Sequence, residues 1–514
     1  MTNLIHTGNK KILYLLLFIV VFSYFLWLNS TPSFTDPDSF YHAKASELIL
    51  SSGPIKDFNW LPYTTLNDVF IDHHFFYHLL LIPFLLLLPP LVATKLAAAI
   101  FATLAIITFQ WLLDRFKIAY SFIYTLILIF SHQFIFRINL AKAPSLSLIV
   151  LLLFIYLLFK NKDKWSFLVF ALSFIYVWLY GGWIILVGIG ILYFLINIIL
   201  QLVKKVKDKK YYFKLFFSMV IGTLAGLIIN PYFPINLKFY YQQTFQIGLV
   251  NYNEIVGVGG EWYGLSIFEL VRHNVFSFSL FIISILLFFI YYKSADAKKT
   301  LLLAVSTIFF VLTLKSQRNI EYFIPFALLF SAYMLNSYFR ANKLKISLTD
   351  VKKYLKNNRA HTIIIILFII LNLSIVLAAN FKGLKNNLRK NYTFNQFEEI
   401  SNWFIDNTSQ GDIIFHDGWD DWPVLYYHNS ENRYIVGLDP TFMYLENKRQ
   451  YWRWKNIATG VTDQEICSTI ADKFDSSYVL VKFTNKTLKE HIEKDALCTL
   501  VFENSDGSIY KIKY

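Results

Sequence analysis

Long apolar runs separated by short polar stretches recur along the first three quarters of the chain. A transmembrane helix needs about 17–25 predominantly apolar residues to cross a bilayer. The pattern therefore predicts a polytopic α-helical membrane protein with about 11 transmembrane helices, within a range of about 11–13. The expected spans are 11–29, 92–113, 118–136, 144–160, 165–181, 183–203, 212–231, 275–292, 299–314, 319–338 and 361–380.

Two apolar runs near the N-terminus are interpreted separately. The first follows Lys10 and Lys11, is too long for the core of a signal peptide and has no small-residue cleavage site after it. We therefore expect it to remain as a membrane anchor. The run Phe75–Leu88 is shorter and follows polar residues, so we expect an interfacial or half-inserted helix there.

The charges on the connecting loops predict the orientation, because Lys and Arg gather on the cytoplasmic side of a membrane. With a cytoplasmic N-terminus, every dense basic cluster between spans falls inside: Asp114–Lys117, Lys160–Lys164, Lys204–Lys210, Lys293–Lys299 and Arg340–Arg359. The long loops 30–74 and 232–274, and everything after residue 381, are then external. We expect a multi-pass protein of the plasma membrane.

The tail of the chain changes character, because charged residues there alternate with short apolar stretches. Expected strands near 412–415, 434–437 and 478–482 alternate with helix-like segments at 395–405, 463–473 and 487–495. We therefore predict two domains: a transmembrane domain, 1–383, and an external α/β domain, 384–514. Cys467 and Cys498 both fall in the second domain, where a disulfide is permitted and two free buried cysteines are equally compatible.

Composition supports this picture. Of the 514 residues 56% are apolar and only 16% charged, the mean hydropathy is +0.46 and the net charge is +14. Disorder, collagen and disulfide-scaffold classes are excluded. A basic excess in a soluble protein suggests nucleic acid, but here the excess lies in the cytoplasmic loops. The membrane is therefore an expected partner and nucleic acid is not.

The first external loop opens with two carboxylates, Asp36 and Asp38, directly after the first span. Oxygen ligands suit a divalent cation such as Mg²⁺ or Mn²⁺, and two carboxylates can also serve as acid and base. The alternative is an Asx-turn in which Asp36 caps the helix beginning near Ser39. The same loop ends in Asp68, Asp72, His73, His74 and His78, which suggest either a second ligand set or hydrogen bonds to lipid headgroups.

The second external loop places Glu254 and Glu261 around three glycines, which is typical of a loop that closes over a substrate, or of a flexible tether. Arg318 lies where a span begins on the external side. A guanidinium at that depth suits bidentate binding of a phosphate, or serves as a snorkelling anchor.

The predicted external domain opens with Trp419-Asp420-Asp421-Trp422 after its first strand. Two tryptophans around two aspartates could hold a polar ligand by stacking and hydrogen bonding. An ordinary turn after a strand explains the aspartates equally well, but it does not explain the tryptophans.

Taken in this order, the features resemble the catalytic subunit of oligosaccharyltransferase, a membrane glycosyltransferase of the C-type superfamily. The segment Asp38-Ser-Phe-Tyr41-His42-Ala-Lys44 is similar to that family's first-loop motif Asp-Pro-Tyr-Tyr-His-Leu-Arg, whose aspartate ligates the metal and contacts the acceptor. The resemblance thus selects Asp38 over Asp36. Gly259-Gly260-Glu261-Trp262 stands where the family has its mobile-loop glutamate motif, which favours Glu261 over Glu254.

Two further segments carry the resemblance. Arg318-Asn-Ile-Glu-Tyr322-Phe resembles the family's Arg-Phe-x-Tyr-Tyr segment, whose arginine contacts the lipid-linked phosphate. Trp419-Asp420-Asp421-Trp422 resembles the Trp-Trp-Asp-Tyr-Gly motif that reads the acceptor sequon, with Asp420 in the aspartate's place but without the Tyr-Gly end.

The sequence departs from the family in its second external loop. Where the family has a carboxylate pair for the metal, this chain reads Arg137-Ile-Asn-Leu-Ala-Lys142-Ala-Pro-Ser145. Either the metal site is rebuilt, with Asp36, Asp72 or His74, or no metal is used and Lys142 supplies the positive charge.

The resemblance implies transfer of a sugar or oligosaccharide from a polyprenyl (pyro)phosphate donor to a protein or lipid acceptor on the external face. It makes Asp38 and Glu261 catalytic, with Asp36 and Asp38 as candidate ligands of Mg²⁺ or Mn²⁺. Arg318 and Lys142 would bind the donor phosphate, and the Trp419–Trp422 motif the acceptor. Two alternatives stay open: a monosaccharide transferase that modifies a lipid or wall polymer, and a transporter with an external binding domain.

Overall fold

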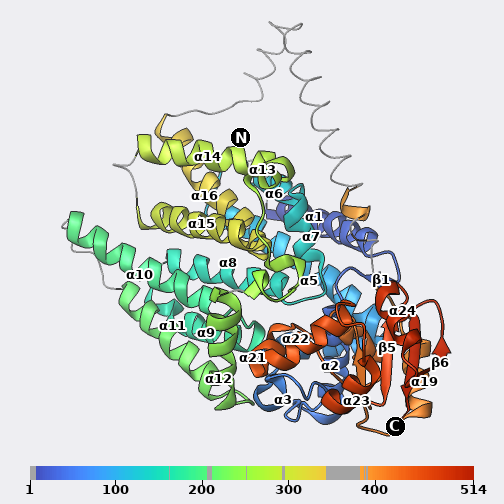
Figure 1. Ribbon diagram of the computed structural model, residues 1–514. Helices are drawn as coiled ribbons and strands as arrows, with labels where there is room; N and C mark the ends of the chain where they lie inside the picture. The colour runs from blue at the N-terminus through green and yellow to red at the C-terminus, as the bar shows by residue number, and fades with distance from the viewer. Residues whose placement is uncertain are drawn as a thin grey trace, which may run out of the picture.

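The computed structural model describes residues 7–160, 162–204, 211–250, 252–291, 296–342, 383–386, 388 and 392–513. A large helical body carries a small sheet domain at one end (Figure 1). The expected span at 361–380 lies outside the described residues. In the described part, the helices before the sheet domain are α1 (Thr7–Leu28), α2 (Asp38–Ser52), α3 (Leu66–Val69), α4 (Phe75–Leu85), α5 (Pro90–Arg115), α6 (Ser121–Ile129), α7 (His132–Asn139), α8 (Pro144–Lys160), α9 (Ser166–Leu179), α10 (Ile184–Lys204), α11 (Tyr211–Ile228), α12 (Ile235–Tyr241), α13 (Ile267–His273), α14 (Val275–Ile290), α15 (Ala297–Lys315) and α16 (Ile320–Ala341).

The apolar runs form helices close to their expected positions, but the expected count of 11 spans is not confirmed. Among the described residues, 6 helices are long and apolar enough to cross a membrane, or up to 8 if each of two bent pairs is one span. Three shorter apolar helices, α4, α8 and α9, lie among them. The chain is thus a multi-pass membrane protein, and its described part holds 6 to 8 helices long enough to span a membrane.

The single span expected at 118–136 is replaced by two helices. Helix α6 and helix α7 are bent by 72° at a short break. Helix α7 carries Arg137 and Asn139, both buried, and the bend turns this polar segment toward the protein interior. An ionisable side chain is costly in lipid, so the break keeps Arg137 among protein partners.

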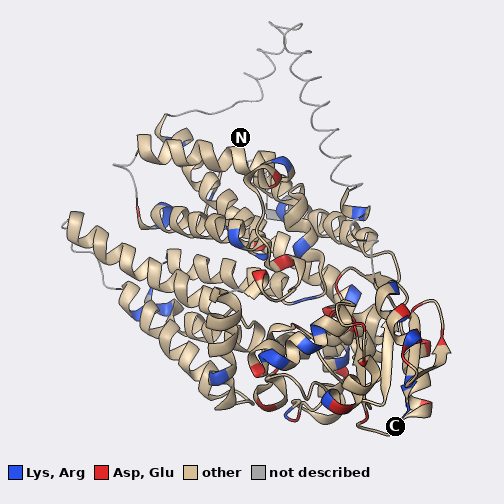
Figure 2. Ribbon diagram, in the orientation of Figure 1, with Lys and Arg blue, Asp and Glu red and all other residues tan. Residues whose placement is uncertain are grey.

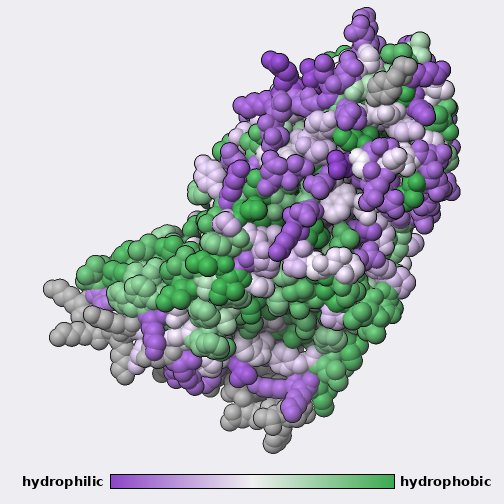
Figure 3. All heavy atoms as spheres, turned by 90° about the horizontal axis from the view of Figure 1, so that it is seen from below, coloured by the Kyte–Doolittle hydropathy of each residue, from purple (hydrophilic) through white to green (hydrophobic). Residues whose placement is uncertain are grey.

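The surface agrees with a membrane location. Figure 3 shows a broad hydrophobic belt across the molecule with a mostly hydrophilic part beyond it. Large apolar side chains are exposed on α1, α10, α11 and α14, including Leu15, Leu202, Ile221 and Phe289. Contiguous apolar surface of this kind favours contact with lipid. Charged residues are sparse along the long helices and gather around the sheet domain (Figure 2).

The sheet domain has the α/β composition expected from the sequence. Its five-stranded sheet has the order β4-β3-β5-β7-β6, in which β3 is parallel to both β4 and β5, and β7 is antiparallel to both β5 and β6. The strands are β3 (Ile413–His416), β4 (Arg433–Tyr434), β5 (Tyr478–Lys482), β6 (Cys498–Glu503) and β7 (Gly507–Ile512). The helices are α19 (Glu398–Asn407), α20 (Trp422–His428), α21 (Thr441–Glu446), α22 (Lys448–Ala458), α23 (Ile466–Phe474) and α24 (Lys486–Lys494).

Two contacts fix the sheet domain against the first long loop, 30–74. Strand β1 (Ser33–Phe34) pairs antiparallel with β2 (Tyr392–Thr393), directly before Asp36. Helix α2 packs on α20, and its buried Phe40 and Tyr41 share one apolar cluster with Trp422. Segments separated by more than 350 residues therefore form one core next to the first-loop carboxylates.

A disulfide joins Cys467 at the start of α23 to Cys498 in β6, which decides between the two alternatives left open by the sequence. The bridge closes a loop of 31 residues in sequence separation. We expect the double variant Cys467→Ala/Cys498→Ala to lower the free energy of unfolding of the sheet domain by about 3 kcal/mol. Pulse proteolysis in urea measures this loss. Reduction of the wild type should reproduce it, and an unchanged urea midpoint in the double variant would contradict a stabilising bridge.

Candidate active site

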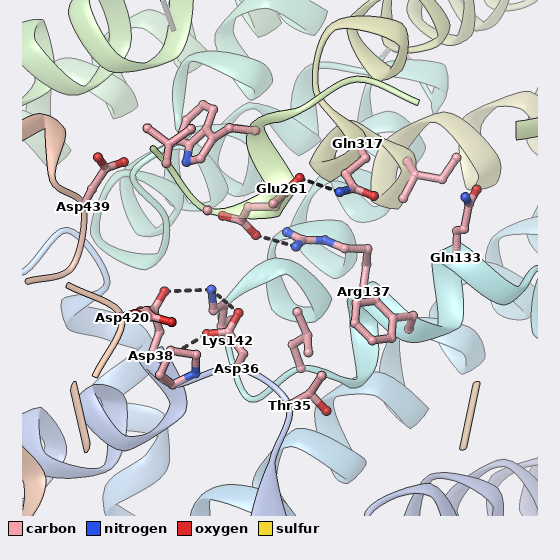
Figure 4. Close-up of a pocket in the computed structure, with 18 of the residues that line it drawn as sticks. Thr35, Asp36, Asp38, Gln133, Arg137, Lys142, Glu261, Gln317, Asp420 and Asp439 are labelled. Carbon is pink, nitrogen blue, oxygen red and sulfur yellow. Dashed lines mark hydrogen bonds and ion pairs between the residues drawn. The ribbon is translucent and has the colours of Figure 1, made fainter. Parts of the chain in front are cut away.

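A cavity of about 640 Å³ lies where the first loop, the α7–α8 connection, the second long loop and the sheet domain meet. Its wall includes Asp36, Asp38, Arg137, Lys142 and Glu261 (Figure 4). The sheet domain adds Trp419, Asp420 and Asp439. Residues that are hundreds of positions apart in sequence are thus brought to one space.

Asp36 and Asp38 are held by local backbone structure. The side-chain Oδ1 of Asp36 accepts a hydrogen bond of 2.9 Å from the backbone N–H of Asp38, where α2 begins. This is the Asx-turn expected as one reading of the sequence. The turn leaves the second oxygen of Asp36 and the carboxylate of Asp38 free to face the cavity, so the structural and the functional readings are compatible.

Lys142 joins the two carboxylates. Its Nζ lies 2.7 Å from Oδ2 of Asp36 and 2.7 Å from Oδ2 of Asp38 (Figure 4). The side chain comes from the short connection between α7 and α8, and only 12% of it is exposed. Burial alone would lower the pKa of Lys142, but the two carboxylates raise it above its ordinary value. The ammonium is therefore a fixed positive charge in the cavity wall.

Glu261 faces the same space from the opposite side. It forms an ion pair with Arg137, whose Nε also lies 3.2 Å from Oε2 of buried Glu321. Burial alone would raise the pKa of Glu261, but the charges of Lys142, Arg137 and Arg318 hold it well below its ordinary value. Glu261 is thus a carboxylate at physiological pH.

The connection between α15 and α16 holds the Glu261 segment in place. Ser316 Oγ donates a hydrogen bond of 2.8 Å to the backbone carbonyl of Glu261, and the Gln317 amide donates one of 2.5 Å to Gly260. The guanidinium of Arg318 lies 4.4 Å from the ring centroid of Trp262 and 3.8 Å from Oε1 of Glu261. Glu254, the reserve candidate, is exposed elsewhere on the loop and does not line the cavity.

A smaller chamber of about 130 Å³ continues inward from these residues. Its wall contains three cations, Arg137, Lys142 and Arg318, and also Asp38 and Glu261. His42, His73 and His74 complete one side, and burial lowers the pKa of each, so these rings are neutral at physiological pH. Such a chamber is chemically suited to a phosphate group beside a carboxylate.

The four residues of the tryptophan–aspartate motif separate into two pairs. Trp419 and Asp420 line the large cavity, and Asp420 accepts a 2.9 Å hydrogen bond from the Tyr392 hydroxyl. Trp422 is fully buried and stacks on Tyr426, with 4.7 Å between the two ring centroids, so its ring does not reach the cavity.

Asp421 is also buried, and it pairs with Lys482 at 2.8 Å. Burial raises the pKa of Asp421 to about 8, and Lys482 opposes this rise. Asp421 and Trp422 are therefore not placed to contact an acceptor. Helix α20 begins at Trp422, and both side chains are buried in the core.

The histidines at the end of the first loop form a hydrogen-bonded chain. Nδ1 of His78 lies 2.6 Å from Asp72, and Nε2 of His78 lies 2.7 Å from Nδ1 of His42. Both ring nitrogens of His78 are therefore occupied by protein partners. Asp68 is exposed on α3 and is not one of these hydrogen-bonded residues. A second metal-ligand set is not formed by these residues.

The donor set does not fit the divalent cation, Mg²⁺ or Mn²⁺, that the resemblance implies. Among the described residues, no group of three or more His, Cys, Asp and Glu side chains is placed to hold a metal ion. Asp36 and Asp38 both contact an ammonium, and Glu261 contacts a guanidinium. Divalent metal sites of this type need several free oxygen ligands, which these pairings do not leave.

Several site residues were not singled out from the sequence. Arg137 and Glu321 are buried partners of each other, Arg137 directly after the expected span 118–136 and Glu321 near the start of the span 319–338. Tyr392 and Lys482 contact the two aspartates of the sheet domain. A glutamate within an apolar span, as at Glu321, is a signal that could have identified the first pair. Nothing in the local sequence marks the second.

No protein-family model matches the chain, and no curated protein sequence matches it. Among the solved structures similar to it are two of an oligosaccharyltransferase from Archaeoglobus fulgidus. The crystal structure of its apo form has a TM-score of 0.64 at 13% identity and covers 93% of this chain and 70% of that chain. The structure of AglB with an inhibitory peptide and a dolichol-phosphate has a TM-score of 0.66 at 13% identity and covers 94% and 70%. The resemblance expected from the sequence is thus confirmed as a likeness of fold.

Proposed function

We propose that this protein is a membrane glycosyltransferase that moves a sugar or oligosaccharide from a polyprenyl (pyro)phosphate donor to an acceptor on the external face. The observation that carries the proposal is the inner chamber, where Arg137, Lys142 and Arg318 surround a phosphate-sized space next to Asp38. The fold likeness supports it, because the AglB structure holds a dolichol-phosphate and an inhibitory peptide.

The proposed reaction is a displacement at the anomeric carbon of the donor sugar. An acceptor nucleophile forms the new bond, and the bond from the anomeric carbon to the phosphate oxygen breaks, so its electron pair leaves with the phosphate. Arg318 and Lys142 stabilise this developing charge. Asp38 orients the acceptor and takes its proton, and Glu261 assists from the opposite wall. A divalent cation is assigned no step, because the donor set does not fit one.

The proposed orientation places the N-terminus in the cytoplasm and the sheet domain, 384–514, outside the plasma membrane. The basic clusters between spans support it. The Cys467–Cys498 disulfide supports it independently, because such bridges persist in oxidising compartments. The donor lipid would lie between the helices of the domain 1–383, with its phosphate at the chamber.

The acceptor in this proposal is a protein, contacted by Trp419 and Asp420. One observation favours the second candidate, a monosaccharide transferase acting on a lipid or wall polymer. Asp421 and Trp422 are packed into the sheet domain, so only half of the tryptophan–aspartate motif reaches the cavity. An enzyme that recognises a peptide sequence would be expected to expose more of this motif to the cavity.

Cells that lack the protein distinguish these acceptors. Mass spectrometry of glycopeptides and of extracted lipids and wall polymers is compared between the deletion strain and a strain carrying the gene. Loss of glycopeptides supports a protein acceptor, and loss of a modified lipid or polymer supports the second candidate. If neither glycan class changes, the proposed function is wrong.

A transporter is not favoured, because the charged groups converge in external loops and at the sheet domain, whereas transporter sites lie near the bilayer midplane. Ion-dependent uptake into vesicles containing the purified protein would reverse that judgement.

The pH profile of transfer should report the ionisation of Asp38. Burial raises the pKa of Asp38 to about 6, which Lys142 opposes and Asp36 reinforces. Because the proposed role requires the carboxylate, kcat/KM should fall as pH decreases through about 6, by about tenfold per unit below it. Lys142→Gln should move this midpoint upward, since the ammonium that lowers the pKa is lost. A rate that is constant from pH 8 to pH 5 would contradict the assignment.

A further inference from the structure

Two cations of the α7–α8 region each pair with two carboxylates at or next to the cavity. Lys142 contacts Asp36 and Asp38, and Arg137 contacts Glu261 and Glu321. Both cations come from one short segment of the chain. Together they supply two unit charges, which is the charge of one divalent metal ion.

The position of Nζ of Lys142 is as informative as its charge. The atom is equidistant, at 2.7 Å, from one oxygen of Asp36 and one oxygen of Asp38. Mg²⁺ or Mn²⁺ binds oxygen at about 2.1 Å, so an ion shared by these two oxygens would occupy the space of the ammonium. The ammonium and a metal cation at the same two oxygens would also repel each other, because both are positively charged. The ammonium and a shared metal ion therefore exclude each other.

The second oxygen of Asp36 and the carboxylate on the opposite wall are also engaged by protein groups. Oδ1 of Asp36 accepts the backbone N–H of Asp38, and Glu261 is paired with Arg137 and approached by Arg318. Each of these carboxylates already has a cationic or hydrogen-bonded partner from the protein. The carboxylates that a metal ion would need are thus already engaged by protein groups, beside a cavity of about 640 Å³.

From this arrangement we infer that Lys142, supported by Arg137, is a built-in cation that takes the position of a divalent metal between Asp36 and Asp38. Its catalytic meaning rests on the proposed function: the ammonium orients Asp38 toward the acceptor, so that transfer proceeds without a divalent metal. The exclusion of a metal ion from this position is a binding property that can be measured apart from transfer.

The test is a titration of Mn²⁺ into the detergent-solubilised full-length protein, with free Mn²⁺ measured by electron paramagnetic resonance. Lys142→Gln removes the charge and adds an oxygen ligand beside two free carboxylates. We expect it to bind Mn²⁺ at least tenfold more tightly than the wild type does, and the additional change Asp38→Asn to abolish this gain. Lys56→Gln, at an exposed lysine of the same loop, should leave Mn²⁺ binding unchanged.

Equal Mn²⁺ affinity in the wild type and in Lys142→Gln, including no binding by either, would overturn the inference. Binding to the wild type that is lost in Asp36→Asn would also overturn it, and this comparison does not require the Lys142 variant to fold. In the transfer assay, rates with and without EDTA should agree within twofold, whereas a tenfold loss restored by Mn²⁺ would contradict the inference. If no transfer occurs in any condition, the proposed function fails while the Mn²⁺ comparison still decides the metal question.

Discussion

Replacing Asp38 with asparagine is expected to reduce glycosyl transfer about 100-fold or more, because a positioned carboxylate that takes a proton contributes about 10²–10⁴-fold to a rate. Asparagine keeps the size of the side chain and loses its charge. Asp36 and Lys142 would remain paired at 2.7 Å, so the cavity wall is expected to persist. The measurement is kcat/KM for transfer of label from a polyprenyl-phosphate-linked sugar in isolated membranes.

The matched control is Asp68→Asn, which neutralises an exposed aspartate on α3 of the same loop. This control should retain wild-type transfer, and both variants should keep the thermal unfolding temperature of the wild type. Asp38→Asn with undiminished transfer would remove Asp38 from the reaction and with it the assignment of this cavity as the active site.

The second large effect is expected from Arg318→Ala, with kcat/KM lowered by about 10²–10³-fold, the usual cost of removing one donor at a site of developing charge. Arg318 lies against Trp262 at the chamber, where the negative charge of the leaving phosphate would form. Arg318→Lys should be intermediate, because an ammonium restores the charge but not the two-pronged geometry.

Arg272→Ala serves as the control for Arg318, because Arg272 is exposed on α13 and does not line either cavity. It should leave the rate unchanged. If Arg318→Ala raises KM for the donor while kcat stays constant, Arg318 binds the donor without stabilising the leaving group, and the proposed mechanism is wrong on that point.

The sequence predicted most of the helices and strands because hydrophobic periodicity is a local property. The strand at Tyr478–Lys482 and the helix at Ile466–Phe474 were expected nearly where they occur. The break between α6 and α7 was not expected, although the polar residues Ser131, His132 and Gln133 stand at it. What no local pattern records is the set of contacts that α7 makes beyond the break, from Arg137 to Glu261 and Glu321.

In the site, too, the residues were predicted from the sequence but their contacts were not. The structure brings Asp38, Glu261, Lys142 and Arg318, each chosen from the sequence, to the walls of adjoining cavities. It also shows what each side chain contacts, and these partners could not be derived. Trp422 was a candidate acceptor-binding residue because an ordinary turn after a strand does not explain a tryptophan. Its ring is instead buried against Tyr426, so it serves the packing of the core.

The central claim, transfer from a polyprenyl-phosphate donor, is tested most directly with the purified protein in lipid vesicles that contain a polyprenyl-phosphate-linked sugar labelled in the glycan. Membrane extract or peptide from the source cells provides the acceptor. We expect label to move to the acceptor while free polyprenyl (pyro)phosphate appears in equal amount, and we expect Asp38→Asn to stop both. Vesicles in which the donor stays intact with the wild-type protein, in the presence of every acceptor fraction and with or without added Mn²⁺, would contradict it.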